Sequence, residues 1–435
     1  MRALWLFPFC LSASLAAQAA PSLVIDVSTG DILHQEQATQ PWFPASVSKL
    51  MTVYVALKAV RAGRATLNTP LVVSARAARM APSKMGFRPG LEITLDNALK
   101  ILMVKSANDV AVTVAEGIGG SVEGFAELMN AESVALGMRE SHWVNPNGLP
   151  DSRQVTSARD MALLGRALYR DFPEQAGLFS IGALQLGSKI MANHNGLLGR
   201  YQGSDGMKTG FTCAAGFNVV ASATRGGRRL IAVVLGAPSA RDRTAKAANL
   251  FDRAFAGGAS TSGNLRALPT TDGDPPNMRG EACGRRVKGG SFASEIEDFS
   301  VPLAGIQQQL EKNPEKEFLF EAAGLMRPPP AGRNVAFLDR PHFDPVPIYI
   351  GRAPGWSGTA LAAHVAARPE PLQAFAPQKP KVLDGAQSAV PEDPAAVPLN
   401  LTGGVADAPK PGRINVAKLA KKPAKLPKPK HAAPE

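Results

Sequence analysis

Apolar residues recur with two different periods along the first 256 residues, and these periods separate predicted strands from predicted helices. Short apolar runs between turn-forming residues predict strands, and apolar residues three or four positions apart predict helices. The predicted strands are residues 22–27, a strand that returns from residue 32, residues 71–73, a strand that carries residues 208–210, and residues 217–223 and 230–235. One predicted helix begins at Ser46, and the others cover residues 96–104, 109–116, 122–136, 157–170 and 239–255.

Strands therefore occur early and late in this part of the chain, with mostly helical sequence between them. This order predicts an α+β (mixed) fold for residues 20–256, in which one antiparallel sheet is flanked by helices. A mostly helical subdomain is expected at about residues 65–160. We expect a cleft between the sheet and this subdomain.

The pattern weakens after residue 256. Residues 257–290 are polar and rich in Pro and Gly, residues 292–320 have the spacing of short helices, and residues 346–350 resemble a strand. We therefore expect a poorly defined segment with short elements over residues 257–367. Residues 368–435 consist mainly of Pro, Ala, Lys and Gln, which bury too little apolar surface to fold, so a disordered tail is predicted. The two parts form a largely irregular C-terminal extension.

The N-terminus has the features of a secretory signal peptide. Residues 3–15 form an apolar stretch too short to span a bilayer, and residues 17–19 are a small-x-small cleavage site. We expect residues 1–19 to be removed and the protein to be exported to the periplasm. Cys213 and Cys283 are then the remaining cysteines. In an exported protein they either form one disulfide or stay as two thiols, and the sequence leaves both possibilities open.

The full chain has a net charge of +12, and part of this charge lies between Lys410 and Lys430, where Lys alternates with Pro and Ala. Such a tail either contacts anionic membrane lipid or wall polymer, or is only a solvated extension. A contact would place the protein at the periphery of the inner membrane or the cell wall. The tail lacks aromatic residues that stack on bases, and export separates the protein from nucleic acid, so no nucleic-acid partner is predicted.

Ser46 and Lys49 are the first candidates for chemistry. Residues three apart lie on one face of a helix, so the hydroxyl and the amine would be neighbours. A serine needs a nearby base to act as a nucleophile, and a lysine is a base only when it is neutral. Burial and the positive end of a helix both favour the neutral amine. The spacing predicts that Ser46 attacks and Lys49 accepts its proton, although a capping serine before a surface lysine has the same spacing.

Ser106-Ala107-Asn108 is a second motif, at the end of a predicted helix. In an extended loop its first and third side chains would point the same way. Ser106 would then pass a proton between Lys49 and a leaving amine. Asn108 would hydrogen-bond a substrate amide.

Lys208-Thr209-Gly210 is a third motif, on a predicted strand where Lys208 and Gly210 share a face. Lys208 and Thr209 suit a substrate carboxylate, and the missing side chain of Gly210 would let a substrate backbone approach. The three motifs in this order predict a serine–lysine acyl-transfer site that needs no cofactor. The six histidines include no i,i+3 or i,i+4 pair, so no metal site of the zinc peptidase kind is predicted.

These motifs point to a family. Over about residues 21–256 the chain resembles the low-molecular-weight penicillin-binding proteins that are serine-type D-alanyl-D-alanine carboxypeptidases. The likeness extends beyond the motifs to residues 27–33, 145–151, 157–162, 193–195 and 205–212. The resemblance implies a β-lactamase/transpeptidase-like fold.

The resemblance also implies a reaction. Ser46 would attack the carbonyl of the penultimate D-alanine of a peptidoglycan stem pentapeptide, and Lys49 would take its proton. Ser106 would help to relay that proton to the departing terminal D-alanine. The backbone N–H groups of Ser46 and Phe211 would form the oxyanion hole. β-Lactams would acylate the same serine as covalent inhibitors.

Other functions stay open at this stage. A class A-type β-lactamase shares the first and third motifs, but it needs a carboxylate that activates water, and no Glu-x-x-Leu-Asn element occurs between Asn108 and Lys208. A D,D-endopeptidase would cleave cross-links with the same site. A wall-binding or β-lactam-sensing protein would keep the fold without turnover. After residue 256 the chain also departs from the family, whose members commonly carry a β-rich second domain and an amphipathic helix that rests on the membrane.

Overall fold

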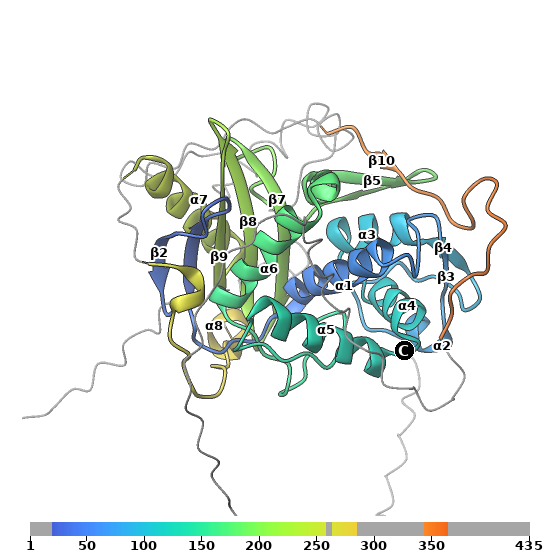
Figure 1. Ribbon diagram of the computed structural model, residues 1–435, viewed down its shortest axis with the longest axis horizontal. Coiled ribbons are helices and arrows are strands. Elements are labelled where there is room, and N and C mark those ends of the chain that lie inside the picture. The colour runs from blue at the N-terminus through green and yellow to red at the C-terminus, as the bar shows by residue number, and fades with distance from the viewer. Residues whose placement is uncertain (1–19, 258–262, 285–342, 364–435) are drawn as a thin grey trace, which may run out of the picture. The chain divides into compact units, whose positions relative to one another are not determined.

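The computed structural model describes residues 20–257, 263–284 and 343–363, all within the first of two units into which the chain divides (Figure 1). Its main sheet has five antiparallel strands in the order β2-β1-β9-β8-β7. These strands are β1 (Ser22–Asp26), β2 (Ile32–Glu36), β7 (Ser204–Thr212), β8 (Gly216–Arg225) and β9 (Arg228–Ala237). Because β1 pairs with β9, the early and late strands meet in one sheet, which confirms the predicted fold class.

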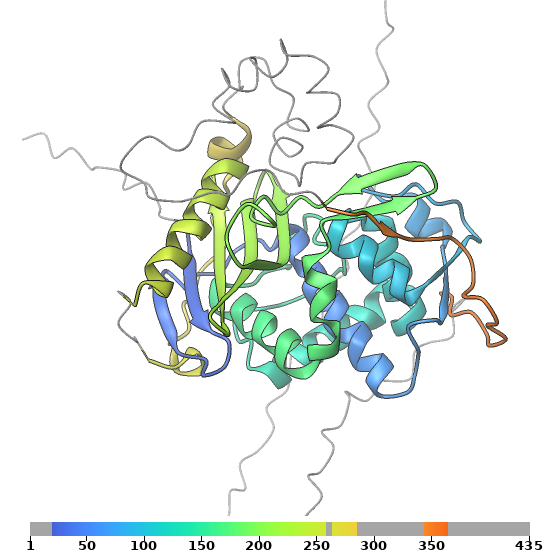
Figure 2. The same ribbon diagram turned by 90° about the horizontal axis from the view of Figure 1, so that it is seen from above.

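Alternate residues of the same strands are buried on opposite faces of the sheet. On β9, Ile231 and Val233 belong to the apolar core that includes α6 (Ala158–Asp171). Ala232 and Val234 belong to a second core, which includes α7 (Ala240–Phe255). Figure 2 shows α7 on one face of the sheet and α6 with the other large helices on the opposite face. Burial on both faces explains the nearly continuous apolar sequence of this strand.

The helical part of the protein is built around α1. Its helices are α1 (Lys49–Arg61), α2 (Ala75–Ala78), α3 (Leu95–Val104), α4 (Asn108–Gly119) and α5 (Val122–Leu136). A short antiparallel ladder, β3 (Pro70–Val72) with β4 (Glu92–Thr94), completes this part. Most of α1 is buried because it contacts α3, α4, α5 and α6. Each helix predicted within residues 20–256 is present, and α5 has the predicted bounds.

Serine caps begin α6 and α7. Ser157 Oγ accepts the backbone N–H of Asp160 at 3.1 Å, and Ser239 Oγ accepts that of Asp242 at 3.0 Å. Each bond satisfies a donor that has no partner within the first turn of its helix. These caps fix the residues at which α6 and α7 begin.

The structure differs from the predicted elements in several places. The helix expected at Ser46 begins with a 3-10 turn, η1 (Ala45–Ser48), before α1. A hairpin of β5 (Ala183–Leu186) and β6 (Lys189–Ala192) was not predicted, because its short strands contain few β-branched residues. The strand expected at residues 346–350 is only β10 (Val346–Pro347), which pairs in parallel with β5. A further 3-10 segment, η2 (Pro173–Ser180), follows α6.

Two segments beyond residue 256 pack onto the preceding part of the chain. In the first, η3 (Leu265–Ala267) buries Leu265, whose carbonyl accepts the Arg159 Nε–H at 3.1 Å. In the second, Tyr349 O accepts Asn97 Nδ2 at 3.1 Å, and Arg352 forms an ion pair with Glu92. The described parts of the expected irregular segment are thus attached to the domain that contains the three motifs.

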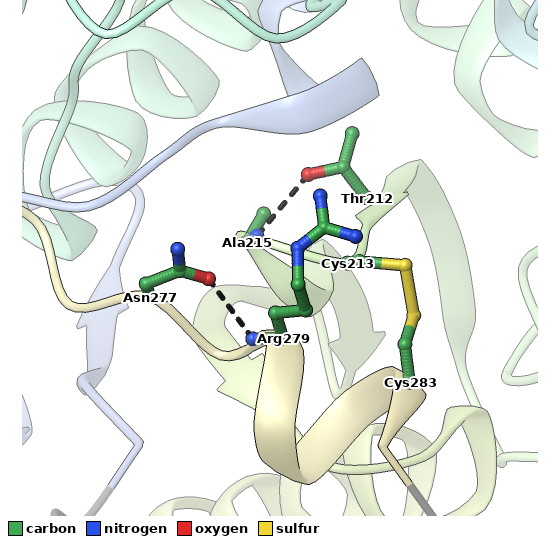
Figure 3. The surroundings of a disulfide bond; sticks show 6 residues. All are labelled: Thr212, Cys213, Ala215, Asn277, Arg279 and Cys283. Atoms are coloured by element: carbon green, nitrogen blue, oxygen red, sulfur yellow. Dashed lines mark hydrogen bonds between the residues drawn. A yellow bond between two sulfur atoms is a disulfide. The ribbon is translucent and has the colours of Figure 1, made fainter. Parts of the chain in front are cut away.

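Cys213 and Cys283 form a disulfide, which decides the alternative that the sequence left open (Figure 3). It ties α8 (Arg279–Cys283) to the turn between β7 and β8. The backbone N–H of Met278 also donates to Ala214 O at 3.0 Å, so α8 is held at both of its ends.

Several predictions concern residues outside the described part of the chain. These are the signal peptide (residues 1–19), the short helices within residues 292–320, and the tail (residues 368–435) with Lys410 to Lys430. Among the described residues, no helix combines the length and the apolar character that crossing a membrane requires.

We expect the Cys213→Ser/Cys283→Ser double variant of the full chain to be less stable than the wild type. The disulfide joins residues 70 positions apart. Its loss should lower the free energy of unfolding by about 2–4 kcal/mol, because the unfolded chain gains freedom. Urea denaturation followed by circular dichroism measures the difference.

Reductant provides the control for this experiment. It should move the midpoint of the wild type to that of the double variant and leave the double variant unchanged. Equal midpoints for the oxidised wild type and the variant would contradict a stabilising role of the disulfide.

Candidate active site

The amine of Lys49 lies at the centre of the site. Lys49 Nζ is 3.0 Å from Ser46 Oγ, 2.8 Å from Asn108 Oδ1 and 2.6 Å from Asn147 O. The residue is fully buried. A neutral amine has two N–H donors and one lone pair. The two donors match the carbonyl oxygens of Asn108 and Asn147, which leaves the lone pair for the Ser46 hydroxyl.

The surroundings of Lys49 favour this neutral form. Burial is the main cause that lowers its pKa well below the ordinary value, and the nearby Lys208 lowers it further. The Asp109 carboxylate has a smaller, opposite effect. The site therefore holds a lysine that can accept a proton, beside a serine that can donate one.

Ser106 and Asn108 do not form the extended loop that was expected, so that local prediction is wrong. Ser106 has a φ of 60°, in the left-handed region, and Asn108 is the first residue of α4. The chain must turn sharply here because α4 begins directly afterwards. Both residues nevertheless line the same cavity as Ser46. The Ser106 hydroxyl is buried and has no hydrogen-bond partner among the described residues, which leaves it available to a ligand.

Asn108 has partners within the protein for both ends of its amide. Its Oδ1 accepts from Lys49, and its Nδ2 donates to Ala81 O at 2.9 Å. These bonds fix the orientation of the amide and, through it, the position of the Lys49 amine. Contact of Asn108 with a substrate amide stays a prediction.

Gly210 lies against the turn that carries Ser46. A Cβ atom built at Gly210 would be 2.8 Å from Ser46 N and 2.9 Å from Val47 N, closer than real side chains come. The expected reason for this glycine was the approach of a substrate backbone. The structure gives a different reason, since the backbone that approaches is the protein's own. This contact places the Ser46 N–H beside β7, and the oxyanion hole of Ser46 and Phe211 stays a prediction.

Lys208 lies behind the wall of the cavity. Its side chain is buried, and Nζ donates to Thr209 O at 2.9 Å. Burial, together with the Arg243 guanidinium, lowers the pKa of Lys208 to about 7. Direct contact of Lys208 with a substrate carboxylate stays a prediction. The charge of Lys208 lowers the pKa of Lys49 and of His194.

The cavity beside Ser46 has a volume of about 320 Å³. Six of the predicted site residues line it: Ser46, Ser106, Asn108, Thr209, Gly210 and Phe211. Lys49 and Lys208 do not line it and lie beneath its surface. The fold therefore brings together all three motifs, which are separated by up to 164 positions in the chain (210 minus 46).

Sequence reasoning missed the part that Arg243 and Asn147 take in this site. Arg243, on α7, lines the cavity, and its Nη2 donates to His194 O at 3.4 Å. It places a cation at the surface of the cavity, near the buried Lys208. Asn147 contributes its backbone carbonyl, which a motif of side chains does not reveal. The available signal in the sequence was the cluster of turn-forming residues around Asn147.

His194 also lines the cavity. Burial and the cations Lys208, Lys105 and Arg243 lower its pKa to about 3, so its imidazole is neutral at neutral pH. Among the described residues, no group of three or more His, Cys, Asp or Glu side chains is arranged to hold a metal ion. The cavity instead offers hydroxyl, amide and cationic groups.

The backbone around Ser46 is closely packed. Ala45 has a φ of 49°, and Gly148, with a φ of 81°, lies so close that a Cβ atom there would be 1.8 Å from Ala45 O. The loop of Asn147 therefore presses against the turn of Ser46. This contact brings the Asn147 carbonyl to Lys49.

Comparison with known proteins supports the family resemblance that the motifs indicate. A family model described as D-alanyl-D-alanine carboxypeptidase matches residues 10–239, which is more than half of the 435 residues. The chain is 33% identical over 248 residues to D-alanyl-D-alanine carboxypeptidase DacF of Bacillus subtilis. That match covers 56% of this chain and 64% of the relative, so the chain spans less than two thirds of the relative's length.

Solved structures show the same fold. D-alanyl-D-alanine carboxypeptidase DacD from Francisella tularensis aligns with a TM-score of 0.53 and 30% identity, over 58% of this chain and 73% of that chain. Penicillin-binding protein D2 from Listeria monocytogenes, in its ampicillin-bound form, aligns with a TM-score of 0.51 and 29% identity. The alignment covers 55% of this chain and 99% of that chain. The family resemblance inferred from the motifs is confirmed, and this chain belongs to the D-alanyl-D-alanine carboxypeptidase family of peptidases.

Proposed function

We propose that the protein is a serine D,D-carboxypeptidase that removes the terminal D-alanine from peptidoglycan stem pentapeptides. The observation that carries this proposal is the 3.0 Å contact between Ser46 Oγ and the buried amine of Lys49. A nucleophile and a base within hydrogen-bond distance are the minimum that acyl transfer requires. Cell-wall synthesis and remodelling is the process that such an activity serves.

In the acylation step, Ser46 Oγ attacks the carbonyl carbon of the penultimate D-alanine, and its proton moves to Lys49 Nζ. The negative charge that develops on the carbonyl oxygen is stabilised by the backbone N–H groups of Ser46 and Phe211. Such a donor contributes about 3–4 kcal/mol to transition-state stabilisation. The amide bond breaks, and the proton returns from Lys49 through Ser106 to the departing D-alanine.

The substrate carboxylate belongs at the cationic end of the cavity. Arg243 and Thr209 line this end, and the charge of Lys208 lies behind it. A carboxylate bound there would orient the terminal peptide bond toward Ser46. Water then hydrolyses the ester, with Lys49 as base, and releases the tetrapeptide.

β-Lactams are the expected covalent inhibitors, because they offer a strained amide and a carboxylate to the same groups. Among the lining residues of the cavity there is no Asp or Glu that would activate water for fast deacylation. This observation favours a slowly released acyl-enzyme over the class A-type β-lactamase. Export to the periplasm, and a contact of Lys410 to Lys430 with membrane or wall, are part of the proposal.

We expect Ser46→Ala to abolish release of free D-alanine from diacetyl-Lys-D-Ala-D-Ala, because it removes the nucleophile. The loss in kcat should be at least about a thousandfold. Labelling of the full chain by a fluorescent penicillin should disappear as well. Ser180→Ala is a suitable control, since this serine only donates to the nearby Gly177 carbonyl at the surface.

Two results would contradict the carboxypeptidase. Penicillin labelling of the wild type without release of D-alanine would favour a cross-link endopeptidase or a β-lactam sensor. Rapid hydrolysis of the penicillin would favour a β-lactamase.

We expect Lys208→Gln to change the pH dependence of acylation. Below its own pKa of about 7, the positive charge of Lys208 lowers the pKa of Lys49, so its removal should raise the pKa of Lys49 in that range. Less Lys49 is then neutral at a given pH, and the acid limb of the acylation rate should move to higher pH, by about one unit. The second-order rate constant of penicillin acylation, measured from pH 5 to 10, reports the limb.

The matched control is Lys100→Gln, because Lys100 forms a surface ion pair with Asp96. If Lys208 acted only by binding a carboxylate, Lys208→Gln would lower the maximal acylation rate constant. It would not move the acid limb of the pH profile. An unchanged limb would therefore show that Lys208 does not tune Lys49.

A further inference from the structure

Asn218 is a buried polar residue that the proposed reaction does not use. It lies on β8, and none of its surface contacts solvent. Alternate residues of a strand share a face, and Val220, on the same face, belongs to the apolar core that includes α6. An amide in such surroundings is costly unless each of its polar atoms has a partner. The partners of Asn218 therefore indicate what the residue does.

These partners are backbone groups from two other parts of the chain. Asn218 Nδ2 donates to Phe43 O and to Pro44 O, each at 2.9 Å. Its Oδ1 accepts the Gly236 N–H at 2.8 Å. A rotated amide would place Oδ1 against two carbonyl oxygens, so these partners fix its orientation. The side chain thus fastens the segment before Ser46 to the main sheet.

A bulge in β9 provides the acceptor end of this arrangement with its partner. Two residues of β9, Leu235 and Gly236, lie opposite Asn218 alone. Gly236 has a φ of 75°, and a side chain there would overlap the indole ring of Trp42. The bulge therefore directs the Gly236 N–H to Asn218 and also makes room for Trp42. The Trp42 indole donates to Ala215 O at 2.9 Å, so a second side-chain bond holds the same segment on the sheet.

The two carbonyls that Asn218 binds lie directly before the turn of Ser46. Asn218 is paired with Gly210 across β7 and β8, so both residues present the same face to this turn. A Cβ atom at Gly210 would be 2.8 Å from Ser46 N and 3.1 Å from Pro44 O. Gly210 leaves the space that the turn occupies, and Asn218 supplies the hydrogen bonds that keep it there. The left-handed φ of Ala45 needs such support, because a strained residue persists only when its surroundings fix it.

We propose that Asn218 is a positioning residue for acyl transfer. By binding Phe43 O and Pro44 O, it holds the turn of Ser46 against β7. It thereby sets the position of the Ser46 hydroxyl beside Lys49 and the direction of the Ser46 N–H. Asn218 does not line the cavity, so it acts through the backbone before Ser46 and not by contact with a ligand. This inference rests on the proposed acyl transfer at Ser46, but not on the identity of the peptide.

The test separates binding of a ligand from its reaction with Ser46. The full chain is mixed rapidly with fluorescent penicillin at a series of concentrations, which gives the dissociation constant of the non-covalent complex and the rate constant of acylation. Asn218→Ala should lower the acylation rate constant about ten- to a hundredfold, because the nucleophile is no longer held in place. The dissociation constant should change less than about threefold, because Asn218 does not contact the ligand.

Asn97→Ala is the matched control. Asn97 is also buried, and its Nδ2 donates to a backbone carbonyl of a distant segment, Tyr349 O, at 3.1 Å. Asn97 lies on α3 and does not line the cavity. Its loss removes the same kind of hydrogen bond, so its acylation rate constant should stay within about twofold of the wild-type value.

Asn218→Asp is the conservative variant. A buried carboxyl is protonated at about pH 6, so it keeps one donor for a carbonyl and one acceptor for the Gly236 N–H. At this pH its acylation rate constant should lie between those of the wild type and Asn218→Ala. It also replaces Asn218→Ala in every measurement if the alanine variant does not fold.

A second readout does not depend on the proposed function. Hydrogen exchange followed by mass spectrometry measures the protection of the backbone amides in residues 42–48. Asn218→Ala should speed their exchange about tenfold, the effect of losing one hydrogen bond, and Asn97→Ala should leave it unchanged.

The outcomes distinguish the two ideas. If penicillin does not acylate the wild type but Asn218→Ala speeds this exchange, the proposed function fails and the hold of Asn218 on the turn is supported. Unchanged exchange in Asn218→Ala would overturn the inference. A weaker dissociation constant with an unchanged acylation rate constant would overturn it as well, as would an equal fall of the rate constant in Asn97→Ala.

Discussion

The structure of the site depends on keeping the buried amine of Lys49 neutral and hydrogen-bonded to its three partners. Lys49 has no contact with solvent, and three partners from three different parts of the chain surround its Nζ. A protonated amine would have to donate to all three, whereas a neutral one donates to Asn108 and Asn147 and accepts from Ser46. Burial and Lys208 favour the neutral form. The start of α4, the loop of Asn147 and β7 must therefore keep fixed positions around the start of α1.

Close contact between backbones is what keeps these positions. The loop of Gly148 and the strand of Gly210 both approach the turn of Ser46 at distances that exclude a side chain. Ala45 and Ser106 adopt left-handed φ values, and each costs about 1–3 kcal/mol. The large apolar core around α1 offsets this cost and holds the strained residues in place. Close backbone contacts from a loop and a strand thus position the site, and such preorganisation suits the acyl transfer that we propose.

Prediction from the sequence succeeded where elements are long and regular. The helix α5 has apolar residues at helical spacing, and the strands β8 and β9 are nearly continuous apolar runs between turns, so local pattern was sufficient. It missed the short β5–β6 hairpin and did not show how the segments after residue 256 attach to the rest of the protein. These segments owe their order to partners far along the chain, such as Arg159 for the carbonyl of Leu265. No local period records such contacts.

Taken by itself, the sequence determined which residues make up the three motifs and in which elements most of them lie. Spacing alone identified Ser46 and Lys49 as neighbours, because three positions on a helix are a local relationship. Only the tertiary structure decided the pairing of Cys213 with Cys283 and the entry of Arg243 into the cavity wall. It also decided the burial that shifts the pKa of Lys49. These properties depend on groups brought together from distant positions, and the free energies of burial and close packing exist only once the chain has folded.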